Sequence, residues 1–204
     1  MTWRLRKETA GSGALGDLAS HAVDQVRFLL GQDVVSVAGS TETFVRRRMG
    51  ADGPEDVTVD DAAWATLRTS GGAVASVEVT RMATGRKNAL TVEVYGSSGA
   101  LAFDLERLNE LSVCTDPAAG YTRMLVTEAD QPYVGAWWPP GHVLGWDHTF
   151  TSQAADFLTA IADGAEPTPS FEDGLAVQRV LAAIEESGAQ AGSTVDLSSA
   201  REAS

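Results

Sequence analysis

Residues 11–30 read GSGALGDLASHAVDQVRFLL, a glycine-rich turn that leads into one helix with two different faces. At about 100° per residue, Asp17, His21, Asp24 and Phe28 share one stripe of this helix. The other side carries the apolar residues that we expect to face a core, which are Leu15, Leu18, Ala22, Val26, Leu29 and Leu30. The helix is therefore predicted to have one packing face and one face with ionisable groups.

Asp17 and His21 are four residues apart, so the pattern places a carboxylate beside an imidazole. Histidine titrates near neutral pH, and a carboxylate one turn away can fix its tautomer. This pair suits general acid–base chemistry. A structural interpretation stands beside it, because acidic residues in a first turn also complement the helix dipole and a histidine on a polar face is often only solvated.

The composition limits the kinds of partner. A chain of 204 residues that is 44% apolar can bury a substantial core, and we expect one domain over residues 1–197 and a flexible tail over 198–204. The net charge of −13 argues against a nucleic-acid partner and against an anionic membrane surface. The lone Cys114 fits a reducing cytosol, and no leader or membrane-spanning stretch is visible, so we expect a cytoplasmic protein.

Most of the next hundred residues read as strands. A stretch rich in Val, Thr and Ser at 33–45 predicts a long strand, after the helix ends at Gly31. Alternating runs follow at 63–67, 74–79, 90–94, 100–103, 111–114 and 123–127, with turn-rich joints between them. Val77 and Val79 are expected to point into a core. The pattern predicts an antiparallel meander in which one face of the sheet is buried and the other is polar.

The last third is predicted to form an aromatic loop and two helices. Residues 128–147 carry Trp137, Trp138 and Trp146, which could pack on the sheet, line a pocket or form a subunit contact, and we rank packing or a subunit contact above direct ligand contact. A helix follows over 147–163. A second helix starts after a capping box of Ser170 and Asp173 and runs to about residue 187. The residues expected on one side of the first helix are Phe150, Ala154, Phe157, Leu158 and Ile161. Those that the second helix is expected to bury are Leu175, Val180, Leu181 and Ile184.

Two familiar site patterns are weak in this chain. Gly11, Gly13 and Gly16 match G-x-G-x-x-G, but the residues before them are too charged for a buried parallel strand, so we expect a turn that brings backbone close to the helix start. His142, His148 and Asp147 could supply metal ligands, yet their spacing is not typical of zinc sites, and no metal site is expected.

Taken together, the block from Gly11 to Asp24, with Trp3-Arg4 before it, resembles the Gfo/Idh/MocA oxidoreductases, relatives of glucose-fructose oxidoreductase and inositol dehydrogenase. The segments 156–161 and 169–175 follow in the order that the family shows. The resemblance implies an α+β fold with a large, mainly antiparallel open β-sheet and helices packed on one face, like the C-terminal domain of the family. In the family this domain is joined to an N-terminal Rossmann domain that holds NAD or NADP. This chain has no complete Rossmann domain and lacks the family's Glu-Lys-Pro motif.

The resemblance also implies a site. The family's histidine at the position of His21 acts as acid/base on a sugar or polyol hydroxyl, and Asp17 matches the aspartate that assists it. Asp24, Trp146 and His148 are the expected substrate contacts, whereas the cofactor-binding residues are unknown. NAD or NADP is expected in the intact family unit and no cofactor on this chain alone. The expected partners are a Rossmann-domain polypeptide or a missing N-terminal domain, and a second copy through the sheet face.

Three interpretations follow from the sequence. The chain is the substrate side of an NAD(P)-dependent sugar or polyol oxidoreductase that is inactive alone, or a non-catalytic oligomerisation or ligand-binding protein built on the same domain, or a degenerate product with no activity of its own. The stripe with Asp17 and His21 favours the first.

Overall fold

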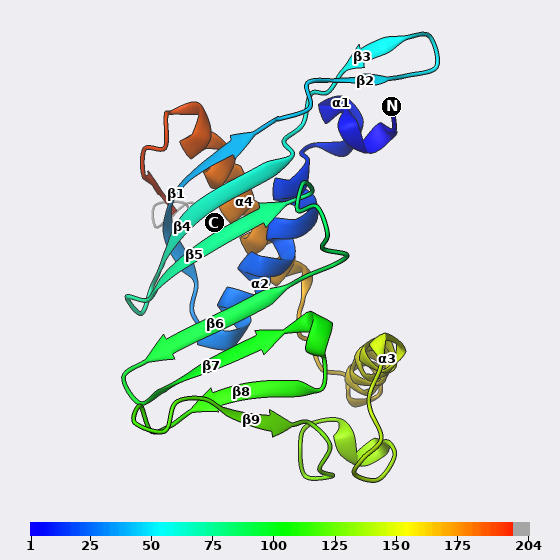
Figure 1. Cartoon of the computed structure of the whole chain (residues 1–204), viewed down its shortest axis with the longest axis vertical. Coiled ribbons are helices and arrows are strands. Elements are labelled where there is room, and N and C mark those ends of the chain that lie inside the picture. The colour runs from blue at the N-terminus through cyan, green and yellow to red at the C-terminus, as the bar shows by residue number, and fades with distance from the viewer. Residues whose placement is uncertain (198–204) are drawn as a thin grey trace. The chain divides into compact units, whose positions relative to one another are not determined.

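The computed structural model describes residues 1–197 (Figure 1). By their contacts these residues form two compact units, the first made of residues 1–84 together with 169–197 and the second of residues 85–168. The tail expected over 198–204 lies outside the described residues.

The first unit is a sheet with helices on one face. A 3-10 helix (Trp3–Leu5), α1 (Lys7–Ala10) and a π turn (Leu15–Ala19) lead into α2 (Ser20–Leu30). The strands and the last helix are β1 (Val34–Glu42), β2 (Arg47–Met49), β3 (Pro54–Asp56), β4 (Ala62–Thr69), β5 (Val74–Thr80), α4 (Phe171–Ala189) and β10 (Val195–Asp196). Four strands pair antiparallel in the order β10-β1-β4-β5, and β2 and β3 form a separate hairpin.

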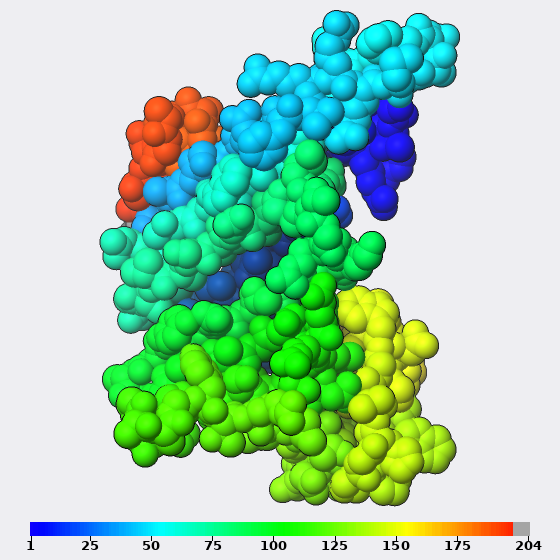
Figure 2. Space-filling view, viewed as in Figure 1, coloured from blue at the N-terminus to red at the C-terminus, as the bar shows by residue number. Residues whose placement is uncertain are grey.

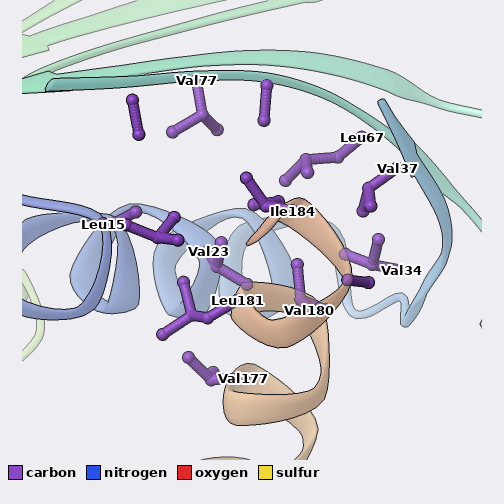
Figure 3. Packing of buried hydrophobic residues seen from close by; sticks show 14 residues of the cluster. Leu15, Val23, Val34, Val37, Leu67, Val77, Val177, Val180, Leu181 and Ile184 are labelled. Carbon is purple, nitrogen blue, oxygen red and sulfur yellow. The ribbon is translucent and has the colours of Figure 1, made fainter. Parts of the chain in front are cut away.

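The core of this unit lies between the sheet and the two helices α2 and α4 (Figure 3). Val23, Val37, Leu67 and Ile184 are fully buried, one each from α2, β1, β4 and α4. Burial of such branched side chains stabilises a fold by about 1.5–3 kcal/mol each relative to exposure. Val77 is buried and Val79 packs against the core, so both inward positions are confirmed.

Two expected core positions are wrong. The buried stripe of the π turn and α2 runs through Leu15, Ala19 and Val23. Leu29 lies away from this stripe, and 49% of its surface is exposed. Leu175 is 52% exposed, because burial along α4 begins only at Val177.

Helix α4 approaches the sheet closely at one point. A Cβ on Gly39 would lie 2.7 Å from the carbonyl oxygen of Trp64 and 3.0 Å from Cγ2 of Ile184, so only glycine fits there. The buried hydroxyl of Ser187 accepts a hydrogen bond from the Gly39 N–H at 2.8 Å and donates one to the carbonyl of Ser193 at 2.6 Å. The first bond joins α4 to β1 at the point of closest approach, and the second joins α4 to the segment before β10.

The second unit is an antiparallel meander followed by one helix. Its elements are β6 (Thr91–Gly96), β7 (Gly99–Asp104), a 3-10 helix (Leu105–Arg107), β8 (Glu110–Cys114), β9 (Thr122–Leu125), a second 3-10 helix (Val134–Ala136) and α3 (Trp146–Asp163). The strands pair in the order β6-β7-β8-β9. The α+β class and the antiparallel pairing are confirmed. Within residues 1–197 each unit contains one four-stranded antiparallel sheet.

No helix within residues 1–197 combines the length and the apolar character needed to cross a membrane.

The capping box at the start of α4 generates the first prediction. The Asp173 carboxylate accepts from the Ser170 N–H at 2.9 Å and from Arg27 Nη1 at 3.2 Å, and these bonds, above all the one from Ser170, lower the pKa of Asp173. A lowered carboxyl pKa stabilises the fold above the ordinary value of 3.8, and the contribution is lost as the pH falls through the folded-state value. Asp173→Asn should therefore lower the free energy of unfolding by about 1 kcal/mol at neutral pH.

Urea titrations between pH 2.5 and 7 measure this effect, and the difference from the wild type should shrink in acid. Glu172→Gln is the matched control, because Glu172 lies in the same first turn but its carboxylate makes no hydrogen bond within residues 1–197. Equal losses in the two variants, or a loss that does not depend on pH, would contradict the role given to Asp173.

Candidate active site

The glycine-rich turn is closed by a carboxylate from a distant part of the chain. The N–H groups of Gly13 and Leu15 each donate to the carboxylate of Asp60, at 2.7 Å, and the Ala14 N–H donates to the Asp60 carbonyl at 3.1 Å. A Cβ on Gly13 would lie 1.8 Å from that carbonyl oxygen, so the close approach requires glycine. Asp60 thereby satisfies N–H groups that a helix start leaves without a partner.

This arrangement does not fit a dinucleotide. A Rossmann turn offers its N–H groups to a pyrophosphate and follows a buried parallel strand. Here Asp60 already occupies N–H groups of the turn, and the preceding residues form the 3-10 helix and α1. The expectation that the glycines make a turn close to the helix start is confirmed.

Asp17 lies in a π turn. Residues Leu15–Ala19 have the wider π geometry, and regular α-helix begins at Ser20. Single π turns inside helices are rare and frequently occur at functional sites. The turn also changes the spacing that the sequence predicts, because Asp17 and His21 are no longer separated by one regular α turn.

The partner of Asp17 is Arg81, at the end of β5. Nη2 of Arg81 donates to Oδ2 of Asp17 at 2.8 Å, and the Arg81 N–H donates to the carbonyl of Asp61 at 2.9 Å. Asp61 is itself buried, and its carboxylate accepts from the N–H groups of Phe44 and Val45 at 2.8 and 2.9 Å. The Asp17 carboxylate is therefore oriented by a residue whose backbone is fixed.

His21 and Asp24 lie on α2 without such partners. His21 is exposed and Asp24 is half-buried, and within residues 1–197 neither side chain makes a hydrogen bond or an ion pair. The structure thus pairs Asp17 with Arg81 and leaves the imidazole of His21 open to solvent. The roles of Asp17, His21 and Asp24 in chemistry stay predictions.

An open cleft of about 450 Å³ lies beside Asp17. Its polar lining residues are Arg4, Ser12, Asp17, Arg81, Gln178 and Glu185, with Trp3 and Leu181 among the apolar ones. The volume falls within the range of small-molecule sites, about 300–1,000 Å³. A cleft with both basic and acidic groups at its wall can orient a neutral, hydroxyl-rich ligand by hydrogen bonds.

The other two expected substrate residues belong to the second unit. Nδ1 of His148 accepts from the Gly145 N–H at 3.0 Å, which caps the start of α3, and its ring lies 4.4 Å from that of Trp137. The ring of Trp146 lies 5.8 Å from that of Phe150 on the same helix. Both side chains have structural contacts in their own unit, and their contact with a substrate stays a prediction.

Across the described residues 1–197, no group of three His, Cys, Asp or Glu side chains is arranged to hold a metal ion.

No local sequence pattern indicates the roles of Asp60 and Arg81. Asp60 bonds to residues 45 and 47 positions earlier, and Arg81 pairs with a residue 64 positions earlier. Neither separation follows a helix or strand period, so no local pattern connects the partners. The doublet Asp60-Asp61 directly before an apolar strand is the one visible signal, because two adjacent carboxylates there need partners.

The closure of the glycine turn gives the second prediction. In Asp60→Asn the amide offers one oxygen in place of two, so either Gly13 or Leu15 loses its acceptor. We expect the free energy of unfolding to fall by about 1–3 kcal/mol, as for a lost bond to a charged group. Chemical denaturation checks it against Asp52→Asn, which removes the same charge from an exposed loop. An unchanged stability in Asp60→Asn would show that the turn does not depend on this carboxylate.

The sequence of this chain is similar to those of known oxidoreductases. A family model described as the GFO/IDH/MocA C-terminal domain matches residues 1–102. Levoglucosan dehydrogenase from Pseudarthrobacter phenanthrenivorans is 38% identical, over 93% of this chain and 53% of that protein. Inositol 2-dehydrogenase from Rhizobium meliloti is 31% identical, over 80% of this chain and 44% of that protein.

Solved structures give the same result. An oxidoreductase domain protein from Kribbella flavida superposes with a TM-score of 0.91 at 47% identity, over 97% of this chain and 54% of that one. Levoglucosan dehydrogenase in complex with NADH and levoglucosan superposes with a TM-score of 0.89 at 39% identity, over 97% and 53%. The chain spans about half the length of the curated relatives that it matches. The protein therefore belongs to the GFO/IDH/MocA family and corresponds to the C-terminal domain of its members.

Proposed function

We propose that this chain is the substrate side of an NAD(P)-dependent sugar or polyol oxidoreductase, with His21 as the acid/base. The observation that carries the proposal is the placement of two side chains on the π turn and α2. Asp17 lies at a cleft, and His21 is exposed to solvent without a hydrogen bond within residues 1–197. Two dehydrogenases of sugars or polyols among the relatives, one of them solved with NADH and levoglucosan, support the reaction class.

The oxidation of an alcohol requires one general base on this chain. Oxidation of an alcohol removes a hydride from carbon and a proton from the hydroxyl oxygen. The hydride acceptor would be supplied by a nicotinamide cofactor held outside this chain. The imidazole of His21 takes the proton, since within residues 1–197 both of its ring nitrogens lack hydrogen-bond partners. In the reverse direction the imidazolium returns that proton to the carbonyl oxygen.

Asp17 and Arg81 act on the position of the substrate. The ion pair at 2.8 Å holds one carboxylate oxygen of Asp17, and its other oxygen can accept a substrate hydroxyl. The Arg81 side chain is 23% exposed, so its guanidinium is partly shielded and the pair is more ordered than a fully solvated one. Asp24, Trp146 and His148 complete the substrate contacts in this proposal.

The cofactor is assigned to another polypeptide or domain. The glycine turn of this chain is closed by Asp60, so it does not offer a pyrophosphate site. We infer that a Rossmann-domain polypeptide or an N-terminal domain holds NAD or NADP, and that the 204-residue chain alone binds no cofactor and is inactive. The lengths of the relatives, about twice the matched region, support this division.

The uncovered face of the first sheet is assigned to a second copy. Trp64, Thr66 and Arg68 of β4 and Val74, Ser76 and Glu78 of β5 are all exposed. In Figure 2 this face is turned to the viewer, and no helix covers β4 or β5. A broad face with an exposed tryptophan and both charge signs suits an isologous contact, in which each copy uses the same residues.

The catalytic assignment is tested by turnover in a reconstituted pair. The chain is co-expressed with the half of levoglucosan dehydrogenase that lies outside the match, and NAD-linked oxidation is followed on levoglucosan, inositol and related sugars. His21→Ala should lower turnover by about 10²- to 10⁴-fold, the usual contribution of a general base. Its stability should change by less than about 0.5 kcal/mol, because His21 is exposed.

His142→Ala is the matched control, because His142 is also exposed and the same side chain is removed. It should leave turnover unchanged. Full turnover in His21→Ala would exclude His21 as the acid/base. A self-associated chain with no turnover in any pairing would favour the non-catalytic oligomerisation protein instead.

The oligomer is tested separately by sedimentation velocity. Thr66→Glu adds a charge to the middle of the uncovered sheet face, and in an isologous contact each dimer receives it twice. We expect the dimer dissociation constant to rise at least about tenfold, the effect of about 1.4 kcal/mol. Thr159→Glu adds the same charge on α3 and should leave it unchanged. Equal behaviour of the two variants would place the contact elsewhere.

A further inference from the structure

Helix α3 presents its apolar side outward. Trp146, Phe150, Phe157, Leu158 and Ile161 fall within about 120° of one another at 100° per residue, and each is between 53% and 63% exposed. We call these five residues the α3 stripe. No residue of this 18-residue helix is buried. An amphipathic stripe of this width normally faces a core.

The contacts of α3 within its own unit use its polar and small residues. His148, Ser152 and Ala160 are its half-buried positions, and Asp156 accepts a hydrogen bond from the Tyr133 hydroxyl at 2.8 Å. In Figure 1 the helix lies to the side of the β6–β9 sheet and not across its face. The second unit thus holds α3 by the side that would ordinarily face water.

The second unit has no other place to bury the stripe. Among residues 85–168, Val134 alone is buried, and the strands β6, β7, β8 and β9 have only half-buried or exposed residues. A contiguous apolar surface of several large side chains on a soluble protein usually marks an interaction site. The stripe therefore indicates a protein partner.

The charge around the stripe argues against a second copy as that partner. Residues 124–168 contain six acidic residues, which are Glu128, Asp130, Asp147, Asp156, Asp163 and Glu166, and neither Lys nor Arg. Two such surfaces placed together would bring like charges into one rim, which is unfavourable at an interface. A partner with an apolar patch and a basic rim fits better.

We propose that the α3 stripe is the docking surface for the cofactor-binding half of the enzyme. This inference rests on the proposed function, which requires such a half. The relatives contain about as much chain outside the match as inside it, so a domain-sized partner exists in each of them. The stripe offers it two aromatic rings in edge-to-face contact, Trp146 and Phe150, beside three further large apolar groups.

The test measures binding of the 204-residue chain to the co-expressed half of levoglucosan dehydrogenase that lies outside the match. Leu158→Glu and Ile161→Glu are made singly, because both side chains are exposed and circular dichroism can check that each variant folds. Thr159→Glu is the control, with the same added charge on the same helix but off the stripe. We expect the dissociation constant to rise at least about tenfold in each stripe variant and to stay unchanged in the control.

Turnover in the same mixtures distinguishes a failure of the docking surface from a failure of the proposed function. Wild-type affinity in both stripe variants, together with turnover that depends on His21, would overturn the docking surface and leave the proposed function intact. Stripe-dependent binding without turnover would support the docking surface and count against the function. A wild-type chain that forms no complex, or a stripe variant that dissociates a self-associated chain, would overturn the inference.

Discussion

The bond between the Asp60 carboxylate and the N–H groups of Gly13 and Leu15 is the constraint on which the site depends. It fixes where the π turn and α2 begin, and therefore which of their residues face the sheet. Leu15, two residues past Gly13, is also a core residue, so the turn and the core support one another. The carboxylate of the neighbouring Asp61 holds the chain after β1, and the backbone carbonyl of Asp61 accepts from the Arg81 N–H. The adjacent residues Asp60 and Asp61 thereby connect the glycine turn, the strand ends and the Asp17 partner.

The two units differ in how they obtain stability. The first unit buries a continuous cluster from α2, α4 and three strands, as a two-layer domain should. The second satisfies its backbone through a four-stranded ladder but buries almost no side chain. Sheets of that kind need a covering layer for independent stability. The second unit is thus built to be completed by contacts that its own residues do not supply.

Local patterns predicted much of the fold. The antiparallel strands, the capping box of Ser170 and Asp173, and the turn role of the glycines all follow from period, turn chemistry or capping, and all are present. The π turn was not predictable, because its residues have an ordinary helical pattern. Arg81 and Asp60 were missed because their partners are far away in sequence. The outward stripe of α3 was predicted as a stripe, but periodicity does not tell which side of a helix meets its own domain.

The π turn at Leu15–Ala19 has a consequence for how this region tolerates length changes. A π turn holds about one residue more than an α turn, so it behaves as an insertion stored within the helix. Loss of a single residue between Gly13 and Ser20 would let the helix return to regular α geometry. Because the bonds to Asp60 hold the chain before the turn and the core contacts of Val23 hold the helix after it, the deletion would be absorbed inside the turn, where it would change the direction of the Asp17 side chain relative to Arg81. The register of this one turn therefore decides whether the carboxylate and the guanidinium meet.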